Sequence, residues 1–239
     1  MNYPTPLLEG VLLRRIQRFL ADIQFSDGQI VRAHVPNTGS LLSCLLPGQM
    51  ARVSCAQDPS RRCPYTLEQL KVGETWVGVN TQRANTLAGE ALRAGLWPTL
   101  AAYHSWRAEV PYGRQRSRID WLSTEVGFPD CYVEVKSVTL SQEPGIGGFP
   151  DAPSSRARKH LEELEYCIDQ GHRAILLYCV QRADVVKVLA AEAIDPAYAR
   201  ALRQAVSRGV EVLALSINPQ KNELVIAREL PVFTWISYG

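Results

Sequence analysis

The sequence lacks several features that would assign it to a common class of protein. Its 239 residues contain no run of about 18 apolar residues, so no membrane-spanning helix is expected. The N-terminus has no basic segment followed by an apolar stretch and a cleavage site, so we expect a cytoplasmic protein. The six cysteines form no C-x-x-C pair and no Cys/His cluster with zinc spacing. We therefore expect them to be reduced and to pack as small hydrophobic residues.

The motifs of common catalytic schemes are also missing. The sequence has no G-x-x-x-x-G-K-[ST] loop, no G-x-G-x-x-G after a strand, no G-x-S-x-G elbow and no H-E-x-x-H helix. No small-molecule cofactor is therefore expected. The net charge is weak, since 26 basic and 24 acidic residues leave only +2. Bulk charge alone does not indicate a nucleic-acid partner.

The distribution of charge along the chain is more informative than its total. Basic residues gather in three segments, which hold Arg14, Arg15, Arg18 and Arg32; Arg107, Arg114, Arg116 and Arg118; and Arg156, Arg158 and Lys159. Local basic stripes attract phosphate even when the net charge is near zero. The alternative is three ordinary solvated surfaces.

The first domain, expected over residues 1–82, has the pattern of an all-β fold. Phe19, Ala21, Ile23 and Phe25 alternate with polar positions, which is the period of a half-buried strand. Turn signals such as Ser26-Asp27-Gly28 separate this run from further short strands. Several short strands without an intervening helix favour a small barrel of the OB type.

The second domain, expected over residues 83–239, alternates helices and strands. Asn85 is expected to cap a first helix, and extended segments follow at 105–112, 116–123 and 131–138. A Gly- and Pro-rich loop is expected over 140–153. Ser154 and Asp195-Pro196 are expected to open two further helices, which end at Gly171 and Gly209 and precede the strands 173–180 and 210–217. This order predicts a mixed sheet covered by helices.

Charged residues interrupt two of these apolar strands. Glu134 and Lys136 share one face of the segment 131–138, and Asp120 lies within the preceding strand. A covered strand should be apolar on both faces, and departures from local rules concentrate at functional sites. Asp120, thirteen residues, then Glu134-x-Lys136 is the spacing of the PD-(D/E)xK nuclease core. The alternative is a cross-strand ion pair on an exposed edge.

The chemistry of such a cluster is that of a metal-assisted reaction. Two neighbouring carboxylates repel each other unless a cation lies between them, and Mg²⁺ accepts one or two carboxylates together with water and phosphate oxygens. Asp120 and Glu134 are therefore expected to bind Mg²⁺, with Glu90 as a further candidate ligand and Glu109 as a weaker one. Lys136 could stabilise charge that develops on phosphorus. Lys159 and His160 lie near a helix start that favours phosphate, and His160 is interpreted as a structural or DNA-contacting residue.

With these residues assembled, the chain resembles the sugar fermentation stimulation protein A (SfsA) family from Pro6 to about Pro231. The resemblance is carried by the blocks RRIQRFLADI, DGQIVRAHVPNTGS, LPG, VGVNTQRAN, EAL, RAEVPYG, SRIDWL, CYVEVKSVTL, GFPDAPSSRARKHLEEL, RAILLYCVQR, IDPAYARALRQA and GVEVLAL. Two positions depart from the family pattern. Leu41 stands where a methionine is frequent, and Ala157 stands where a glycine is common.

The resemblance implies an OB-fold domain joined to a PD-(D/E)xK nuclease-like domain, with Asp120, Glu134 and Lys136 on the nuclease-like signature. It also implies DNA binding with little sequence preference and a role in regulating sugar (maltose) metabolism genes. An active Mg²⁺-dependent nuclease acting on DNA or RNA is the alternative function. A third hypothesis is a sugar or protein partner without any nucleic acid.

Residues of the basic segments are the candidate DNA contacts. Phe19 could stack on unpaired bases among the arginines, but its alternation with Ile23 and Phe25 favours burial in the core. The contacts that we expect are Arg14, Arg15, Arg18, Arg32, Arg116, Arg118, Arg156, Lys159 and His160.

Overall fold

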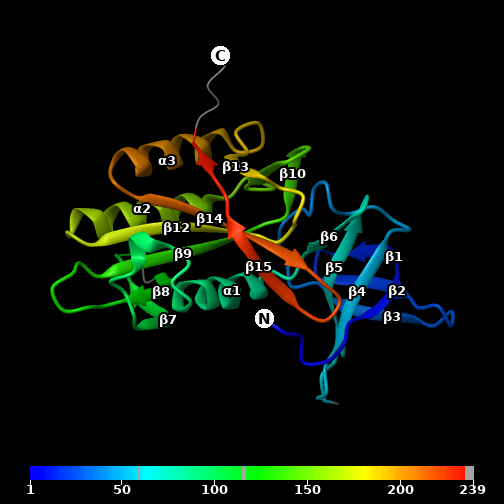
Figure 1. The fold of residues 1–239 in the computed structure, drawn as a ribbon. Coiled ribbons are helices and arrows are strands. Elements are labelled where there is room, and N and C mark those ends of the chain that lie inside the picture. The colour runs from blue at the N-terminus through cyan, green and yellow to red at the C-terminus, as the bar shows by residue number, and fades with distance from the viewer. Residues whose placement is uncertain (59, 115–116, 235–239) are drawn as a thin grey trace.

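The protein is described by a computed structural model that covers residues 1–58, 60–114 and 117–234. Two regions lie side by side, a β-barrel at the N-terminus and a larger α/β region built on a mixed sheet (Figure 1). Within the described residues, no helix is both long enough and apolar enough to cross a membrane.

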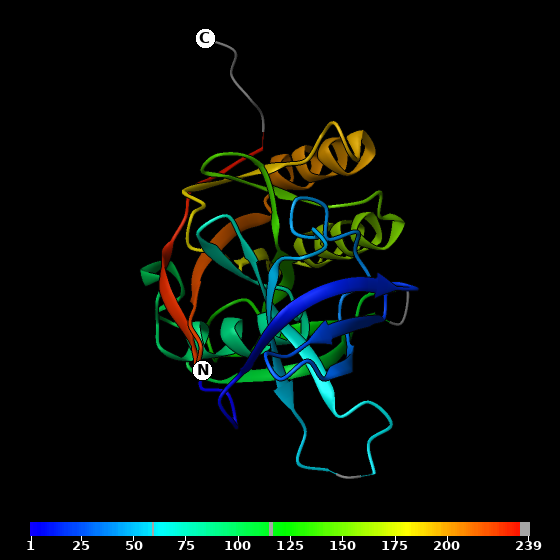
Figure 2. The same ribbon diagram turned by 90° about the vertical axis from the view of Figure 1, so that its right-hand side faces the viewer.

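The N-terminal region is a closed barrel. The strands run in the order β1-β2-β3-β5-β4 and close back onto β1, because β3 pairs with β5 as well as with β2. Figure 2 shows this barrel from its own side. Its interior is apolar, with Leu12, Ile23, Val53 and Leu67 almost fully buried. The predicted OB-type barrel is therefore confirmed. Its strands are β1 (Leu8–Ile16), β2 (Leu20–Gln24), β3 (Ile30–His34), β4 (Met50–Cys55), β5 (Tyr65–Val72) and the appended β6 (Thr75–Gly78).

The α/β region is built on a mixed sheet with the strand order β15-β14-β12-β9-β8-β7. The pairs β9–β12 and β12–β14 are parallel, and the outer pairs are antiparallel, so the predicted mixed sheet is confirmed. The strands are β7 (Trp106–Tyr112), β8 (Ser117–Ser123), β9 (Cys131–Val138), β12 (Arg173–Val180), β14 (Glu211–Pro219) and β15 (Leu224–Glu229).

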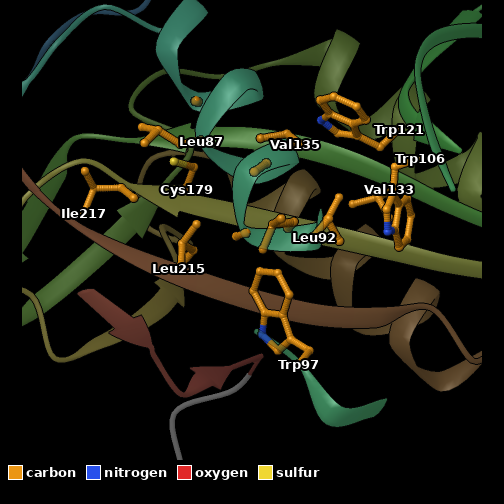
Figure 3. Close-up of a cluster of buried hydrophobic side chains, with 14 of the residues drawn as sticks. Leu87, Leu92, Trp97, Trp106, Trp121, Val133, Val135, Cys179, Leu215 and Ile217 are labelled. Carbon is orange, nitrogen blue, oxygen red and sulfur yellow. The ribbon is translucent and has the colours of Figure 1, made fainter. Parts of the chain in front are cut away.

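Helices cover both faces of this sheet. One face packs against α1 (Gln82–Arg93), and Figure 3 shows Leu87 and Leu92 among Val133, Val135 and Cys179. The other face packs against α2 (Ser155–Asp169) and α3 (Pro196–Ser207) (Figure 1). A central strand is therefore buried on both sides, which explains the continuous apolar run of β12. A short 3-10 helix spans Pro98–Leu100.

Side-chain caps begin α2 and α3 where the sequence predicts them. Ser154 accepts a hydrogen bond from the backbone N–H of Ala157, and Asp195 accepts one from Tyr198. Such caps satisfy N–H groups that a helix leaves free at its first turn. Ala157, a departure from the family pattern, is compatible with this helix start.

Three predictions of local structure are wrong. Asn85 does not cap α1, because the helix already begins at Gln82 and Asn85 lies inside it. Phe19 is not a core residue but is 52% exposed, because the strand ends at Ile16 and the turn breaks the alternation.

The expected loop over 140–153 is the third error, because it contains a β-hairpin. Its strands join a second sheet with the order β10-β11-β13-β16, so a partner distant in sequence supplies the pairing. The glycines that suggested a loop permit close packing, since a Cβ at Gly148 would lie 2.9 Å from the Gln142 side chain. The strands are β10 (Leu140–Glu143), β11 (Ile146–Phe149), β13 (Lys187–Ala190) and β16 (Val232–Phe233).

Polar contacts join the barrel to the α/β region. The N–H of Gly78 donates to the carbonyl of Gln181 at 2.8 Å, and the Ser40 hydroxyl donates to the carbonyl of Asp151 at 2.7 Å. The Asp151 carboxylate also accepts from the N–H of Leu41 at 2.9 Å. The two regions therefore meet at defined points on either side of a cavity.

Candidate functional site

A cavity of about 1370 Å³ lies where the barrel meets the α/β region. The barrel contributes Arg18 and the segment 37–39 to its wall, and α1, the large sheet, the hairpin of β10 and β11 with the segment 150–153, and the start of α2 also line it. The three charged residues of the predicted site, Asp120, Glu134 and Lys136, all line it. Strands that are adjacent in the sheet bring them together.

Asp120 lies where β8 separates from β9. The paired register of these strands ends at Trp121 opposite Val133. Beyond that pair, the Asp120 side chain takes the place of a backbone carbonyl of β8 as the hydrogen-bond acceptor for β9. Its Oδ2 accepts a hydrogen bond from the backbone N–H of Val135 at 2.6 Å. Burial raises the pKa of Asp120 to about 7, and the charge of Glu134 raises it as well. A carboxylate held in this way is electrostatically costly unless a cation approaches.

Glu134 is the most deeply buried acid of the cavity, with 2% of the residue exposed. Its Oε1 accepts from Nζ of Lys136 at 2.5 Å and contacts Nδ1 of His160. Although burial opposes this, Lys136 and His160 lower the pKa of Glu134 below its usual value. Its Oε2 is buried and has no hydrogen-bond partner among the described residues. One oxygen of this carboxylate is therefore bonded, and the other is buried without a partner among the described residues.

His160 positions the bonded oxygen of Glu134. It lies in α2, and its Nε2 accepts from Nε of Arg156 at 3.4 Å. Its Nδ1 faces Oε1 of Glu134. Nζ of Lys136 lies 3.2 Å from the same Nδ1. The histidine acts here by holding a carboxylate in place, in agreement with its interpretation as a structural residue.

Asn85 belongs to the site, although sequence reasoning assigned it to a helix cap. Its Nδ2 donates to Oδ1 of Asp120 at 2.9 Å and to Oε1 of Glu109 at 3.2 Å. Its Oδ1 is buried and has no hydrogen-bond partner within the described ranges. The helical period could have revealed this role, because Asn85 precedes the buried Ala88 and Leu92 by three and seven residues and so shares their face.

Close packing fixes the position of Asn85. The indole Nε1 of Trp121 donates to the carbonyl of Asn85 at 3.1 Å. A Cβ at Gly89 would lie 2.1 Å from the Trp121 ring, so this helix position must be a glycine for the indole to fit. Glu109 adopts a positive φ of 54° in β7, an uncommon conformation outside glycine. This side of the site is therefore formed by β7, which has an unusual backbone conformation at Glu109, and by α1, which packs tightly against Trp121.

Glu90, the further metal ligand that we expected, lies on the same helix and lines the cavity. Its Oε2 is 3.1 Å from the amino group of Met1, so its carboxylate is neutralised by the chain terminus. Asp120 contacts Asn85 and not Glu90 in this arrangement.

The cavity rim carries part of the expected basic surface. Arg18, Arg118, Arg156, Lys159 and His160 line it. Arg118 donates to the carbonyl of Glu109 at 2.8 Å. Arg116 lies outside the described residues.

Three arginines of the barrel have partners within the protein. Arg14 and Arg32 both bind Asp22, at 2.8 and 2.9 Å, on the outer surface. Arg15 donates to the carbonyls of Arg18, Asn37, Gly39 and Ser40. Arg15 thus stabilises the wall of the cavity, and Arg18 is the arginine of this segment that faces into it.

No ready-made cage for a metal ion exists in residues 1–58, 60–114 and 117–234, because no group of three or more His, Cys, Asp or Glu side chains is arranged to hold one. The donors present are carboxylate and amide oxygens from Asp120, Glu134 and Asn85. Hard cations such as Mg²⁺ and Ca²⁺ prefer oxygen donors, and Mg²⁺ usually keeps several waters or phosphate oxygens. These residues therefore fit a divalent cation whose remaining coordination positions are filled by water or by the phosphate oxygens of a bound ligand.

The fold and the site define a class, an OB-type barrel joined to a helix-covered mixed sheet with two carboxylates and a lysine in one cavity. Two family models match the chain: the SfsA N-terminal OB domain over residues 13–79 and the sugar fermentation stimulation protein RE domain over residues 82–223. The chain belongs to the sugar fermentation stimulation protein family.

Individual relatives agree with this assignment. A sugar fermentation stimulation protein homolog of Geobacter sp. (strain M21) is 48% identical over 233 residues, which cover 97% of this chain and 99% of the relative. A homolog of Shewanella baltica (strain OS185) is 45% identical and covers 95% of this chain and 97% of the relative. The solved structure of Pyrococcus furiosus SfsA in complex with Ca²⁺ is 26% identical, has a TM-score of 0.87, and covers 98% of each chain.

Proposed function

We propose that this protein binds DNA in the cavity, with little sequence preference, and holds a divalent cation, Mg²⁺, at Asp120 and Glu134. The observation that carries this proposal is the buried Oε2 of Glu134, which has no hydrogen-bond partner among the described residues, on a residue that lines the cavity together with Asp120. Ca²⁺ in the structure of the Pyrococcus furiosus relative supports a divalent site.

The residues around the acids have distinct roles in this proposal. Asn85 orients Asp120, and His160 orients Glu134, through the hydrogen bonds described above. Arg156 and Lys159 lie in the first turns of α2, where free N–H groups and the helix dipole favour a phosphate. A bound cation would supply Lewis acidity to a phosphoryl oxygen. Lys136 would add a positive charge on the same side.

The family name points to sugar metabolism as the biological setting. We include in the proposal that DNA binding influences the expression of sugar (maltose) metabolism genes. Because rim cations contact phosphates and not base edges, such binding would act over a region of DNA and not at one sequence.

Salt-dependent binding tests the DNA interface. The variant Arg156→Ala plus Lys159→Ala should bind a labelled duplex more weakly, and its plot of log affinity against log salt should be shallower by about 1 to 2, since each phosphate contact contributes about 0.9. The matched control is Arg200→Ala plus Lys221→Ala, which removes two exposed cations that do not line the cavity. Equal slopes for the two variants would remove α2 from the interface.

A Mg²⁺-dependent nuclease is the second candidate function. The observation that favours it is the contact between Lys136 and Glu134, which places an ammonium group beside the proposed cation site. Plasmid nicking and oligonucleotide digestion should then require Mg²⁺ or Mn²⁺. They should fall by about 100-fold or more in Asp120→Ala and in Lys136→Ala, which is the scale for loss of one electrostatic catalytic group. DNA binding without cleavage at any metal concentration would reject this candidate and leave the binding proposal intact.

A further inference from the structure

The turn between β1 and β2 is held in an unusual conformation. Gln17 and Arg18 have positive φ angles of 47° and 66°, a region that residues other than glycine rarely adopt. The guanidinium group of Arg15 bonds the Arg18 carbonyl at 3.0 Å and also bonds three carbonyls of the segment 37–40. The carbonyl of Phe19 accepts from the N–H of Val35 at 2.7 Å. The turn is therefore fixed from both sides.

This conformation presents two side chains that the fold itself does not use. Phe19 is 52% exposed at the end of the turn. Arg18 is exposed, lines the cavity and forms no ion pair with any of the described residues. Arg15 lies close enough to Arg18 that their positive charges interact. The turn thus offers an aromatic face and a concentration of positive charge at the edge of a cavity that contains the two acids.

Aromatic and arginine side chains together fit an unpaired nucleotide. A base with a free π-face can stack on phenylalanine, and the phosphate beside it can bind arginine, whereas the bases of a duplex are already stacked on each other. The loop between the first two strands is also a position from which OB-type barrels contact oligonucleotides. Uncharged sugars also bind such loops, but they would not use Arg18 or the basic rim.

We infer that the β1–β2 turn is a subsite for single-stranded nucleic acid, with Phe19 stacking on a base and Arg18 binding a phosphate. A strand held there enters the cavity that contains Asp120 and Glu134. This inference rests on the proposed function and specifies its substrate class, an unpaired polynucleotide strand. Within that class, DNA and RNA share the chemistry that the subsite recognises.

The test compares single-stranded and duplex ligands by fluorescence anisotropy in EDTA, so that cleavage does not compete with binding. The ligands are labelled oligo-dT, labelled oligo-U and a labelled DNA duplex of roughly 20 units, longer than the site of one OB fold. The variants are Phe19→Ala and Phe19→Trp. The matched control is Phe128→Ala, which removes another phenylalanine that is 53% exposed and lies outside the β1–β2 turn.

Phe19→Ala should weaken binding of the single strands by about 5- to 150-fold, the range for loss of one base–aromatic contact. Phe19→Trp should bind them about as tightly as the wild type, since the larger ring keeps the stacking face. Duplex binding should change by less than about 2-fold in either variant, and Phe128→Ala should leave all affinities unchanged. The oligo-dT and oligo-U arms then show whether DNA, RNA or both are accepted.

Two results would overturn the inference: wild-type affinity of Phe19→Ala for both single strands, or equal loss for single strands and duplex. In either case, wild-type protein that still binds the duplex in a salt-dependent way would leave the proposed function standing. Wild-type protein that binds none of the three ligands would instead refute both.

Discussion

Two buried glutamates, one at the edge of the barrel and one in the large sheet, differ in how their oxygens are bonded. Glu68 of β5 is 1% exposed, and both of its oxygens accept hydrogen bonds, from Ser54, Asn80 and twice from Arg83. Glu134 of β9 is 2% exposed, and one of its oxygens has no partner among the described residues.

This difference separates a fully bonded carboxylate from one that we propose to be a cation ligand. A buried charge contributes to stability only when its partners replace the water that it has lost. Glu68 meets that condition and joins β5 to α1 through Arg83. Glu134 does not meet it, because its Oε2 has no hydrogen-bond partner among the described residues. Burial alone would not distinguish the two residues.

The same substitution at both positions should have unequal effects on stability. Glu68→Gln places an amide N–H₂ against the donors Asn80 and Arg83, so we expect a loss of about 3 kcal/mol or more in the free energy of unfolding. Glu134→Gln keeps an acceptor oxygen for Lys136 and His160 but loses the negative charge, and it also removes the repulsion from Asp120, so we expect a loss of roughly 1 kcal/mol. Urea unfolding at neutral pH in EDTA measures both, and similar losses would remove the distinction.

Divalent cations should stabilise the protein through Glu134 and not through Glu68. At a Mg²⁺ concentration about 100 times the Kd, binding to the folded state adds about 2.7 kcal/mol to the stability of the wild type. For a chain of this size that raises Tm by about 5 to 10 °C. Glu68→Gln should keep this shift and Glu134→Gln should lose it, as measured by calorimetry with and without Mg²⁺. A full shift in Glu134→Gln would place the cation elsewhere.

Asp195 is a third buried carboxylate, and it is bonded like Glu68. Burial opposes its ionisation, but the N–H groups of Ser154 and Tyr198 and the charge of Arg158 lower the pKa of Asp195. Loss of this cap in Asp195→Ala should cost about 1 to 2 kcal/mol at pH 7.

The stability that Asp195 contributes should depend on pH. Because its folded-state pKa is depressed, this contribution is fully present above the ordinary aspartate value of about 3.9 and is lost as the pH falls through the folded value. The difference in unfolding free energy between wild type and Asp195→Ala should therefore shrink below about pH 4. Asp195→Asn, which keeps the cap without the charge, serves as the control, and a difference that is constant with pH would contradict the assignment.

The outer surface of the barrel should show the smallest effect. Arg14 and Arg32 share Asp22, whose side chain is 8% exposed, but the two arginines are 69% and 54% exposed, so solvent screens the arginine side of each pair. Arg32→Ala leaves Asp22 paired with Arg14, and we expect a loss below about 1 kcal/mol by urea unfolding. A loss of unfolding free energy as large as that of Glu68→Gln would show that solvent exposure does not determine how much these ion pairs contribute to stability.

Local pattern was sufficient for much of the fold and for three residues of the site. Strand alternation and turns indicated the barrel, and Ser154 and Asp195 marked helix starts. Asp120, Glu134 and Lys136 were recognisable because charges interrupted apolar strands. Asn85 was misassigned because an asparagine near a helix start matches a cap equally well, and only the packing of α1 against Trp121 distinguishes the two.

The sequence by itself determined most of the element types, the two-part organisation and the family, because these depend on periodicities and motifs within short stretches of chain. Tertiary structure decided which groups meet: the closure of the barrel through β3 and β5, the hairpin of β10 and β11, and the exposure of Phe19. It also decided that Arg15 binds carbonyl groups of its own chain while Arg18 faces the cavity. Hydrogen bonds and burial between distant segments set these outcomes, and no local pattern encodes whether a buried oxygen finds its partner.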